Sequence, residues 1–243
     1  MIVASIKGET SMKVEELKNY GKPLSQVIFS PEAQKQAKQM MKVIRSELRK
    51  ELGLTGIIRL LFNMRRQNRF AKKSDWSDLK EHGLADERFL ESLIQQAAAM
   101  KALANMVGMD EASAIYRRLI DKIGYEVSVP LFPSVDEFTA CGNAFEAFKE
   151  YAKAMVIADQ REGIHEVDII EDDSKTFAYN VKYCAWNEVA KRIGVSKLCY
   201  AGRCYGDEVF FNKAMPQIGV QYKRTGTLTL GNPVCDVRFE LVD

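Results

Sequence analysis

The hydrophobic period of this chain changes near Gly163, and that change constrains the fold more than any other feature of the sequence. Between Pro31 and about Met155, apolar residues recur every three or four positions, which is the spacing of one face of an α-helix. After Gly163, the segments EVDII and TFAYNVKY alternate polar and apolar residues, as half-buried strands do. The sequence therefore predicts an α+β fold, with a helical N-terminal region packed on a C-terminal module that contains an antiparallel sheet.

The segment VSVPLFP is the predicted boundary between these two parts, because its two prolines disfavour a helix and favour a short extended linker. Residues 1–129 are then a helical region and residues 130–243 a cysteine-rich α+β module, unless the two pack as one compact domain. No apolar run approaches the roughly 20 residues that span a bilayer. The opening residues MIVASIKGETSMKVEE are too polar for a signal peptide. We therefore expect a cytoplasmic protein without a membrane span.

Capping residues and glycines delimit the predicted helices. The predicted helix starts are Ser30–Pro31, Asp86, Asp110 and the capping box Ser134–Glu137, and the predicted stops are Gly53 and Gly124. The helix that opens at Ser134 is expected to run through Cys141 and to bury residues as far as Met155. In the C-terminal part we expect a hairpin around residues 171–174, a helix from Ala185 to Ile193 closed by Gly194, a loop LCYAGRCYGDE, and strands Val220–Leu230 and Val234–Val242.

The segment GIIRLLFNMRRQNRF is amphipathic and basic, and residues 1–124 carry 22 Lys and Arg against 15 Asp and Glu. One interpretation is a helix that binds a membrane surface or phosphate groups. The interpretation we favour is a core helix with a basic last turn, which the helix dipole stabilises. Because most of the basic residues are interleaved with acidic ones, we expect no nucleic-acid partner.

The five cysteines are the most distinctive polar residues, and four of them lie between residues 177 and 241. A cytoplasmic location and an odd count favour free thiols over disulfides. Cys184 stands where a strand becomes a helix, and Cys204 has Arg203 and Asp207 as neighbours. By strand alternation Cys235 faces the apolar side of the last strand and Asp236 faces away.

Three interpretations of these cysteines remain open. Cys204 or Cys235 could be a thiolate nucleophile, with Asp207 or Asp236 moving the proton. Alternatively, Cys184, Cys204 and Cys235 could hold a metal, with His165 or a carboxylate as a further ligand. All of them could equally be buried structural thiols, which is the commonest state of cysteine. Arg224, flanked by Thr225 and Thr227, is suited to binding a carboxylate, and His165 is a weaker candidate for proton transfer.

The C-terminal third also resembles a known family. The residues that carry the resemblance are Val181–Cys184, the loop with Cys204 and Asp207, the segment Lys223–Leu228, Gly231 and the closing Cys235–Phe239. In this order and spacing they resemble the L-2-amino-thiazoline-4-carboxylic acid hydrolase-like family. The shorter pattern Gly-x-x-x-Cys-x-x-x-Phe is also similar to vinyl-reductase-type ligand-binding domains. Val237 and Gly226 depart from the residues that the hydrolase family often has.

The resemblance implies a hydrolase acting on C–N bonds of a small cyclic amidine that bears a carboxylate. In the family's named reaction, water opens a 2-aminothiazoline ring to a carbamoyl-cysteine. The implied catalytic residues are Cys204, Cys235, Asp207 and Asp236, and the implied substrate-binding residues are Cys184, Arg224, Thr225 and Thr227. The partner is then a small-molecule substrate, with a homo-oligomer as a further option, and the cofactor is unknown. The alternatives are a small-molecule-binding domain without turnover and a thiolate metal protein.

Overall fold

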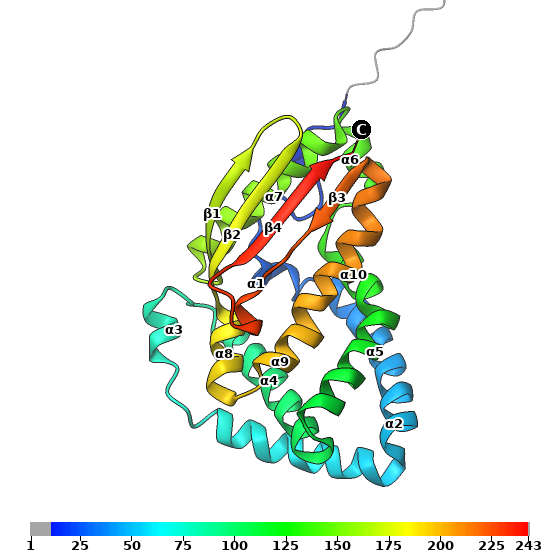
Figure 1. Cartoon of the computed structure of the whole chain (residues 1–243), viewed down its shortest axis with the longest axis vertical. Coiled ribbons are helices and arrows are strands. Elements are labelled where there is room, and N and C mark those ends of the chain that lie inside the picture. The colour runs from blue at the N-terminus through cyan, green and yellow to red at the C-terminus, as the bar shows by residue number, and fades with distance from the viewer. Residues whose placement is uncertain (1–10, 243) are drawn as a thin grey trace, which may run out of the picture.

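The computed structural model describes residues 11–242, and it has the α+β architecture that the change of period predicts (Figure 1). Residues 1–10, which hold most of the polar opening segment, lie outside the described residues. Helices form the lower part of the molecule in this view, and a four-stranded sheet forms the upper left part. Across residues 11–242, no helix combines the length and apolar character needed to cross a bilayer.

The helices and strands follow in chain order. The α-helices are α1 (Leu24–Val27), α2 (Pro31–Ala71), α3 (Ser77–Glu81), α4 (Glu87–Val107), α5 (Met109–Ser128), α6 (Val135–Ala140), α7 (Ala144–Arg161), α8 (Ala185–Ile193), α9 (Ser196–Cys199) and α10 (Tyr205–Ala214). The strands are β1 (His165–Asp172), β2 (Thr176–Cys184), β3 (Val220–Lys223) and β4 (Cys235–Leu241). Short 3₁₀ turns cover Val14–Glu16, Val129–Leu131, Met215–Ile218 and Leu228–Leu230.

The predicted starts of the first two long helices are confirmed by their caps. The Ser30 hydroxyl accepts the backbone N–H of Ala33 at 3.2 Å, and the Asp86 carboxylate accepts that of Phe89 at 2.9 Å. The predicted stop at Gly53 appears as a kink within α2, where this glycine adopts φ 66° and ψ 177°. A positive φ is costly for any residue with a side chain, so the helix changes direction where glycine stands.

Two predictions around the middle of the chain are wrong. The helix α5 does not end at Gly124 but continues to Ser128, and VSVPLFP forms its last residues and a 3₁₀ turn instead of an extended linker. Gly124 is buried inside α5, where a Cβ would lie 2.9 Å from a side-chain methyl of Ile120 and 3.4 Å from one of Val209 in α10. The boundary at residues 129/130 stays a prediction.

The capping box at Ser134 and Glu137 is confirmed, but the helix that it opens is shorter than predicted. Gly142 adopts φ 93°, and the Asn143 side chain caps a second helix by accepting the N–H of Glu146 at 3.1 Å. The chain therefore forms α6 and α7 in place of one long helix. Cys141 lies at the C-terminus of α6, half buried, and not inside a helix.

The sheet has the strand order β1-β2-β4-β3, and every neighbouring pair is antiparallel. The predicted hairpin and the predicted last strand are confirmed, and Cys235, Val237 and Phe239 face the buried side of β4. Strand β3 is shorter than predicted and ends at Lys223. After it, the Asp236 carboxylate holds the chain away from the ladder by accepting the backbone N–H groups of Thr225 and Gly226.

The segment from Ser196 to Ala214 is helical, which corrects the predicted loop LCYAGRCYGDE. Residues Tyr200–Cys204 form a π-helical turn between α9 and α10. Gly202 lies within this turn, and a Cβ there would come within 3.0 Å of the Met100 methyl and 3.1 Å of the Tyr116 ring. The glycine that indicates a turn in the sequence therefore allows the helical segment to approach α4 and α5 closely.

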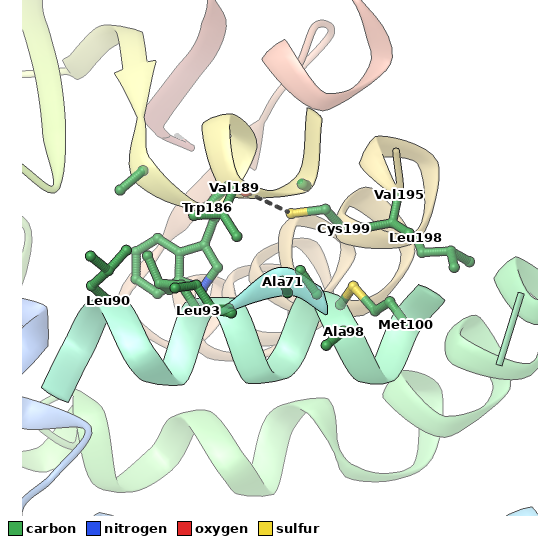
Figure 2. Packing of buried hydrophobic residues seen from close by; sticks show 14 of the residues in the cluster. Ala71, Leu90, Leu93, Ala98, Met100, Trp186, Val189, Val195, Leu198 and Cys199 are labelled. Carbon is green, nitrogen blue, oxygen red and sulfur yellow. Dashed lines mark hydrogen bonds between the residues drawn. The ribbon is translucent and has the colours of Figure 1, made fainter. Parts of the chain in front are cut away.

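Buried side chains form two hydrophobic cores. The first joins α2, α4 and α5 to α8 and α9, and Figure 2 shows Trp186 and Cys199 packed above α4 within it. The second lies against the sheet and includes Tyr151, Phe177 and Phe239. Phe132 packs against both cores. The cavity described next lies where they meet.

Candidate active site

A cavity of about 140 Å³ opens beside the sheet, and side chains from distant parts of the chain line it. Three cysteines contribute to this lining: Cys184 from the end of β2, Cys204 from the π-helical turn and Cys235 from the start of β4. The other polar residues of the lining are Ser128, Asp159, His165, Tyr179, Arg203, Asp207, Arg224 and Thr229. The structure therefore brings the three thiols to a common space together with acids, bases and cations.

A β-bulge places Cys184 on the cavity side of β2. Val181 also lines the cavity, three positions earlier, whereas regular alternation would put Tyr183 and not Cys184 on the same face as Val181. The ladder register shifts between Glu166 and Val167 of β1, so that β2 has one extra residue there. Beyond this bulge, Cys184 stands directly opposite His165. Bulges are frequent next to active sites for this reason.

Asp159, His165 and Cys184 lie in succession at the cavity. The Asp159 carboxylate is buried; one oxygen accepts the Leu24 backbone N–H at 2.7 Å, and the other lies 3.1 Å from His165 Nδ1. The imidazole of His165 and the Cys184 thiol line the same cavity from opposite positions of the β1–β2 ladder, and their interaction lowers the thiol pKa. An acid that orients a histidine, which in turn contacts a nucleophile, is the arrangement of a catalytic triad.

The surroundings of this triad favour the charged forms of cysteine and histidine. Burial alone would raise the pKa of Cys184, but the hydrogen bond and charge of His165, with the backbone N–H groups of Asn187 and Trp186, bring the pKa below its ordinary value. Burial lowers the pKa of His165, yet Asp159 and Cys184 raise it to about 10. Cys184 is also the N-cap residue of α8, where the helix dipole stabilises an anion. Both shifts favour the thiolate and imidazolium form of the pair over the neutral form.

Two backbone contacts fix the triad in place. Gly163 adopts φ 63°, and a Cβ on it would lie 2.4 Å from backbone atoms of both Gly83 and Leu84. This close approach is possible only for glycine, and it sets the path of the chain from α7 into β1. The Ile164 carbonyl then accepts the N–H of Ala185 at 2.9 Å. The residues next to His165 and Cys184 are thus bonded to each other.

Trp186 and Arg203 cover one side of the triad. The Trp186 ring stacks on the His165 ring with centroids 5.8 Å apart, and the Arg203 guanidinium lies 4.6 Å from the Trp186 ring centroid. Cys199, the remaining cysteine of this region, is buried beside Trp186, with its sulfur 3.9 Å from the Trp186 carbonyl (Figure 2). Within residues 11–242, Arg203 has no carboxylate partner, so it is a cation at the cavity that is free to bind an anion.

Cys204 and Cys235 have surroundings that favour the neutral thiol. The Cys204 sulfur lies 3.5 Å from the Thr229 hydroxyl oxygen. Burial, together with the charge of Asp207, raises the pKa of the Cys204 thiol to about 12. The Cys235 sulfur accepts the backbone N–H of Leu228 at 3.3 Å, but burial still raises its pKa. A thiol must lose its proton to act as a nucleophile. Of the three cavity cysteines, Cys184 is therefore the one whose thiolate is stabilised.

Arg224 lies in the cavity wall with its side chain buried and its charge balanced. The guanidinium donates to the Cys204 carbonyl at 2.5 Å and to the Glu208 carboxylate at 2.8 Å, and Asp207 lies 3.4 Å away. These contacts link β3 to α10. Since two carboxylates already neutralise it, Arg224 has less capacity than Arg203 to attract a substrate anion.

Asp236, Thr225 and Thr227 lie outside the cavity lining. Asp236 accepts the hydroxyl of Thr225 as well as two backbone N–H groups, which lowers its pKa against the opposing effect of burial. Thr227 is buried, and its hydroxyl accepts a hydrogen bond from Thr229 at 3.2 Å. These residues hold the segment between β3 and β4 in its shape.

Within the part of the chain that the structure describes, no group of three or more His, Cys, Asp or Glu residues is placed to hold a metal ion. The cavity thiols share a space but do not form a common ligand set. The geometry thus gives no support to the interpretation that Cys184, Cys204 and Cys235 bind a metal together.

Comparison with protein families gives a match to the model for L-2-amino-thiazoline-4-carboxylic acid hydrolase over residues 87–239. The chain belongs to this family. Comparisons with curated proteins and with solved structures give no match. The region matched to the hydrolase family includes Asp159, His165 and Cys184 together with every cysteine and arginine of the cavity.

For this member of the hydrolase family, the sequence suggested Cys184, Cys204, Cys235, Asp207 and Arg224 of the cavity, and His165 as a weaker candidate, but not Asp159 or Arg203 as functional groups. Asp159 had no signal beyond an acid at the end of a predicted helix, six residues before His165. The sequence indicated Arg203 only as a neighbour of Cys204. The direct pairing of His165 with Cys184 depends on the bulge, which residue alternation does not show.

Proposed function

We propose that this protein is a thiol-dependent hydrolase that opens a small cyclic amidine bearing a carboxylate, of the 2-aminothiazoline-4-carboxylate type. The single observation that supports this most is the arrangement of Asp159, His165 and Cys184 at the cavity of a protein that belongs to the hydrolase family. The cavity volume of about 140 Å³ suits a ligand with one ring. Cavities of about 150 Å³ bind benzene.

In the proposed reaction, the Cys184 thiolate attacks the amidine carbon, which is electrophilic once the amidine is protonated. A carbon–sulfur bond forms, and the resulting tetrahedral carbon collapses by breaking one ring bond. The imidazolium of His165 donates its proton to the sulfur or nitrogen that leaves. Asp159 holds the imidazole in position and stabilises its charged form throughout.

Water completes the proposed cycle. Neutral His165 takes a proton from a water molecule as that water attacks the carbon now bonded to Cys184. The Cys184–carbon bond breaks, and the thiolate and imidazolium are restored. The net change is the addition of one water, which gives N-carbamoyl-cysteine if the ring C–S bond opens and S-carbamoyl-cysteine if the ring C–N bond opens. Mass spectrometry after alkylation of free thiols distinguishes the two products.

Arg203 is the group that we assign to the substrate carboxylate. It lines the cavity, has no carboxylate partner among the described residues, and lies over Trp186 beside the triad. A guanidinium binds a carboxylate through two parallel hydrogen bonds. Arg224, to which the sequence hypothesis gave this role, is engaged by Glu208 and by the Cys204 carbonyl.

The deciding experiment is to measure ring opening of 2-aminothiazoline-4-carboxylate by the wild-type protein and by single variants. We expect Cys184→Ala to lose activity by about 10³-fold or more, since it removes the nucleophile of a triad. Cys204→Ser and Cys235→Ser are matched controls on the same cavity, and we expect them to retain activity within about tenfold.

Two outcomes would overturn the proposal. If Cys184→Ala remained active while Cys204→Ser or Cys235→Ser did not, the nucleophile would be one of the thiols first suggested by the sequence, with Asp207 or Asp236 as its proton carrier. If the wild-type protein bound the compound in a saturable manner but formed no product, the ligand-binding alternative would hold. Isothermal titration of the same substrate measures that binding.

A further inference from the structure

The second half of α2 has an outer face that no other part of the described chain covers. Its apolar members are exposed to unusual degrees for their type: Phe62 is 66% exposed, Leu54 60%, Phe70 57%, Leu61 54% and Ile58 48%. The opposite side of the same helix is packed, with Leu60 and Ala71 buried in the first core. The expectation that this segment is a core helix is therefore only half correct.

The same outer face is strongly basic. Between Glu51 and Asp75 the chain has six Lys and Arg and no acidic residue. The exposed cations are Arg59, Arg65, Arg66, Arg69, Lys72 and Lys73. Of these, Lys72 pairs with Glu91, and the others have no carboxylate partner among residues 11–242. A shallow hollow of about 420 Å³ on this face combines cations with aromatic rings. It is lined by Phe62, Arg65, Arg66, Arg69, Phe70 and Lys73.

The kink at Gly53 turns this half of α2 into an edge of the molecule. Figure 1 shows the second half of α2, in cyan, running along the lower edge of the molecule, at an angle to the first half in blue. The outer face, which we define as Leu54, Ile58, Leu61, Phe62 and Phe70 with the flanking arginines and Lys73, points away from the rest of the protein. A helix in this position can lie along a flat surface over its whole length.

The occupant of this face must be anionic and must also cover leucine and phenylalanine side chains. A second copy of the chain would not supply the negative charge, because two such faces would bring arginines against arginines with no acid between them. A nucleic-acid backbone would pair with the cations but leave the apolar side chains in water. An anionic lipid surface supplies phosphates for the cations and acyl chains for the apolar residues.

We infer that the outer face of α2 docks the protein on the surface of an anionic lipid bilayer, parallel to the membrane plane. Docking of this kind needs no membrane-spanning helix. The cations contact lipid phosphates, and Phe62 and Phe70 insert between the headgroups. This inference concerns a surface separate from the cavity and does not depend on the proposed hydrolysis.

Vesicle sedimentation tests the inference with the full chain. Vesicles of phosphatidylcholine alone are compared with vesicles that also contain phosphatidylglycerol. We expect binding only to the anionic vesicles, and we expect that binding to fall as salt is added, because exposed charges are screened. Equal binding to both vesicle types, or binding to neither, would overturn the inference.

Two variants separate the charge from the apolar contact. Arg65→Gln/Arg66→Gln/Arg69→Gln and Phe62→Ser/Phe70→Ser should each weaken binding to anionic vesicles at least tenfold. The matched control is Lys35→Gln/Lys38→Gln/Lys42→Gln, which removes the same charge from the first half of α2, and its binding should stay within twofold of the wild type. All these positions are exposed, so a melting curve checks that each variant is folded.

Two further measurements address the competing occupants. Light scattering reports whether the wild-type chain is a dimer that the Phe62→Ser/Phe70→Ser variant dissociates, and fluorescence anisotropy with a labelled oligonucleotide reports nucleic-acid binding. A dimer that buries this face, or oligonucleotide binding that exceeds vesicle binding and is unaffected by the phenylalanine variant, would overturn the lipid assignment.

Discussion

Cys184 and Cys235 are thiols of the same cavity, yet their surroundings move their pKa values in opposite directions. Burial raises both, but only Cys184 has a histidine and a helix N-terminus to stabilise the anion. The difference comes from position and not from residue type. A cysteine count alone therefore does not identify the nucleophile, whereas the hydrogen-bond partner of each sulfur does.

The pH dependence of kcat/KM follows from the two shifts. Below the pKa of Cys184, which lies under its ordinary value, the thiol is protonated and the rate falls as pH decreases. Above about pH 10, His165 loses the proton that it must donate, and the rate falls as pH increases. We expect a broad plateau between these limits. Iodoacetamide alkylation needs only the thiolate, so it should show the acid limb and not the alkaline one.

Asp159→Asn narrows the plateau, because it removes the carboxylate that raises the His165 pKa. We expect the alkaline limb to move down by about 1–3 pH units, the usual effect of one adjacent opposite charge. An alkaline limb that stayed near pH 10 would show that Asp159 does not act on the histidine.

Arg203→Gln should raise KM about 10- to 100-fold with a smaller change in kcat, because the guanidinium binds the carboxylate and takes no part in bond breaking. Arg203→Lys should restore part of the loss. Arg192→Gln is a matched control, since Arg192 also lies over a tryptophan, at 4.7 Å from the Trp76 ring centroid, but away from the cavity. An unchanged KM for Arg203→Gln would indicate that Arg224, and not Arg203, binds the substrate carboxylate.

At the scale of secondary-structure elements, the turn from α7 into β1 determines the site. Gly163 and Gly83 bring two backbone segments into contact just before His165. We expect Gly163→Ala to lower the free energy of unfolding by about 2–5 kcal/mol, since a strained positive φ and an overpacked contact add. Gly231→Ala is the control: its φ is 89° with nothing within 4 Å, so about 1–2 kcal/mol is expected. Urea unfolding of both variants measures the difference.

Local signals predicted elements well where the signal is a cap or an alternating pattern. Ser30, Asp86, the Ser134 capping box and Gly194 mark real element ends, and the hairpin follows from its alternation. Gly124 and Gly202 predict a helix end and a loop wrongly, because both lie inside helical segments, and at Gly202 the neighbours that need the space are distant in sequence. The site depends on such distant contacts and on a bulge, so its cysteines could be named from the sequence but its triad could not.

For the whole molecule, buried and exposed phenylalanines contribute unequally to the free energy of unfolding. The core against the sheet depends on aromatic packing around Phe239, which is 1% exposed and lies 4.7 Å from Phe148 between ring centroids. Phe239→Ala should cost about 3–5 kcal/mol, a large part of the stability of an ordinary domain. Phe62→Ala, on the exposed face of α2, should change the unfolding free energy by less than about 0.5 kcal/mol. Thermal or urea unfolding compares the two.

The π-helical turn Tyr200–Cys204 couples this stability to the cavity. It accommodates one more residue than an α-helical turn, and Gly202 within it allows the segment to approach α4 and α5 closely. The turn contributes Arg203 to the cavity lining, while α10, which follows it directly, contributes Phe210 and Ala214 to the second core. A side chain at position 202 would push this segment away from α4 and α5, and it would therefore disturb the cavity wall and the second core together.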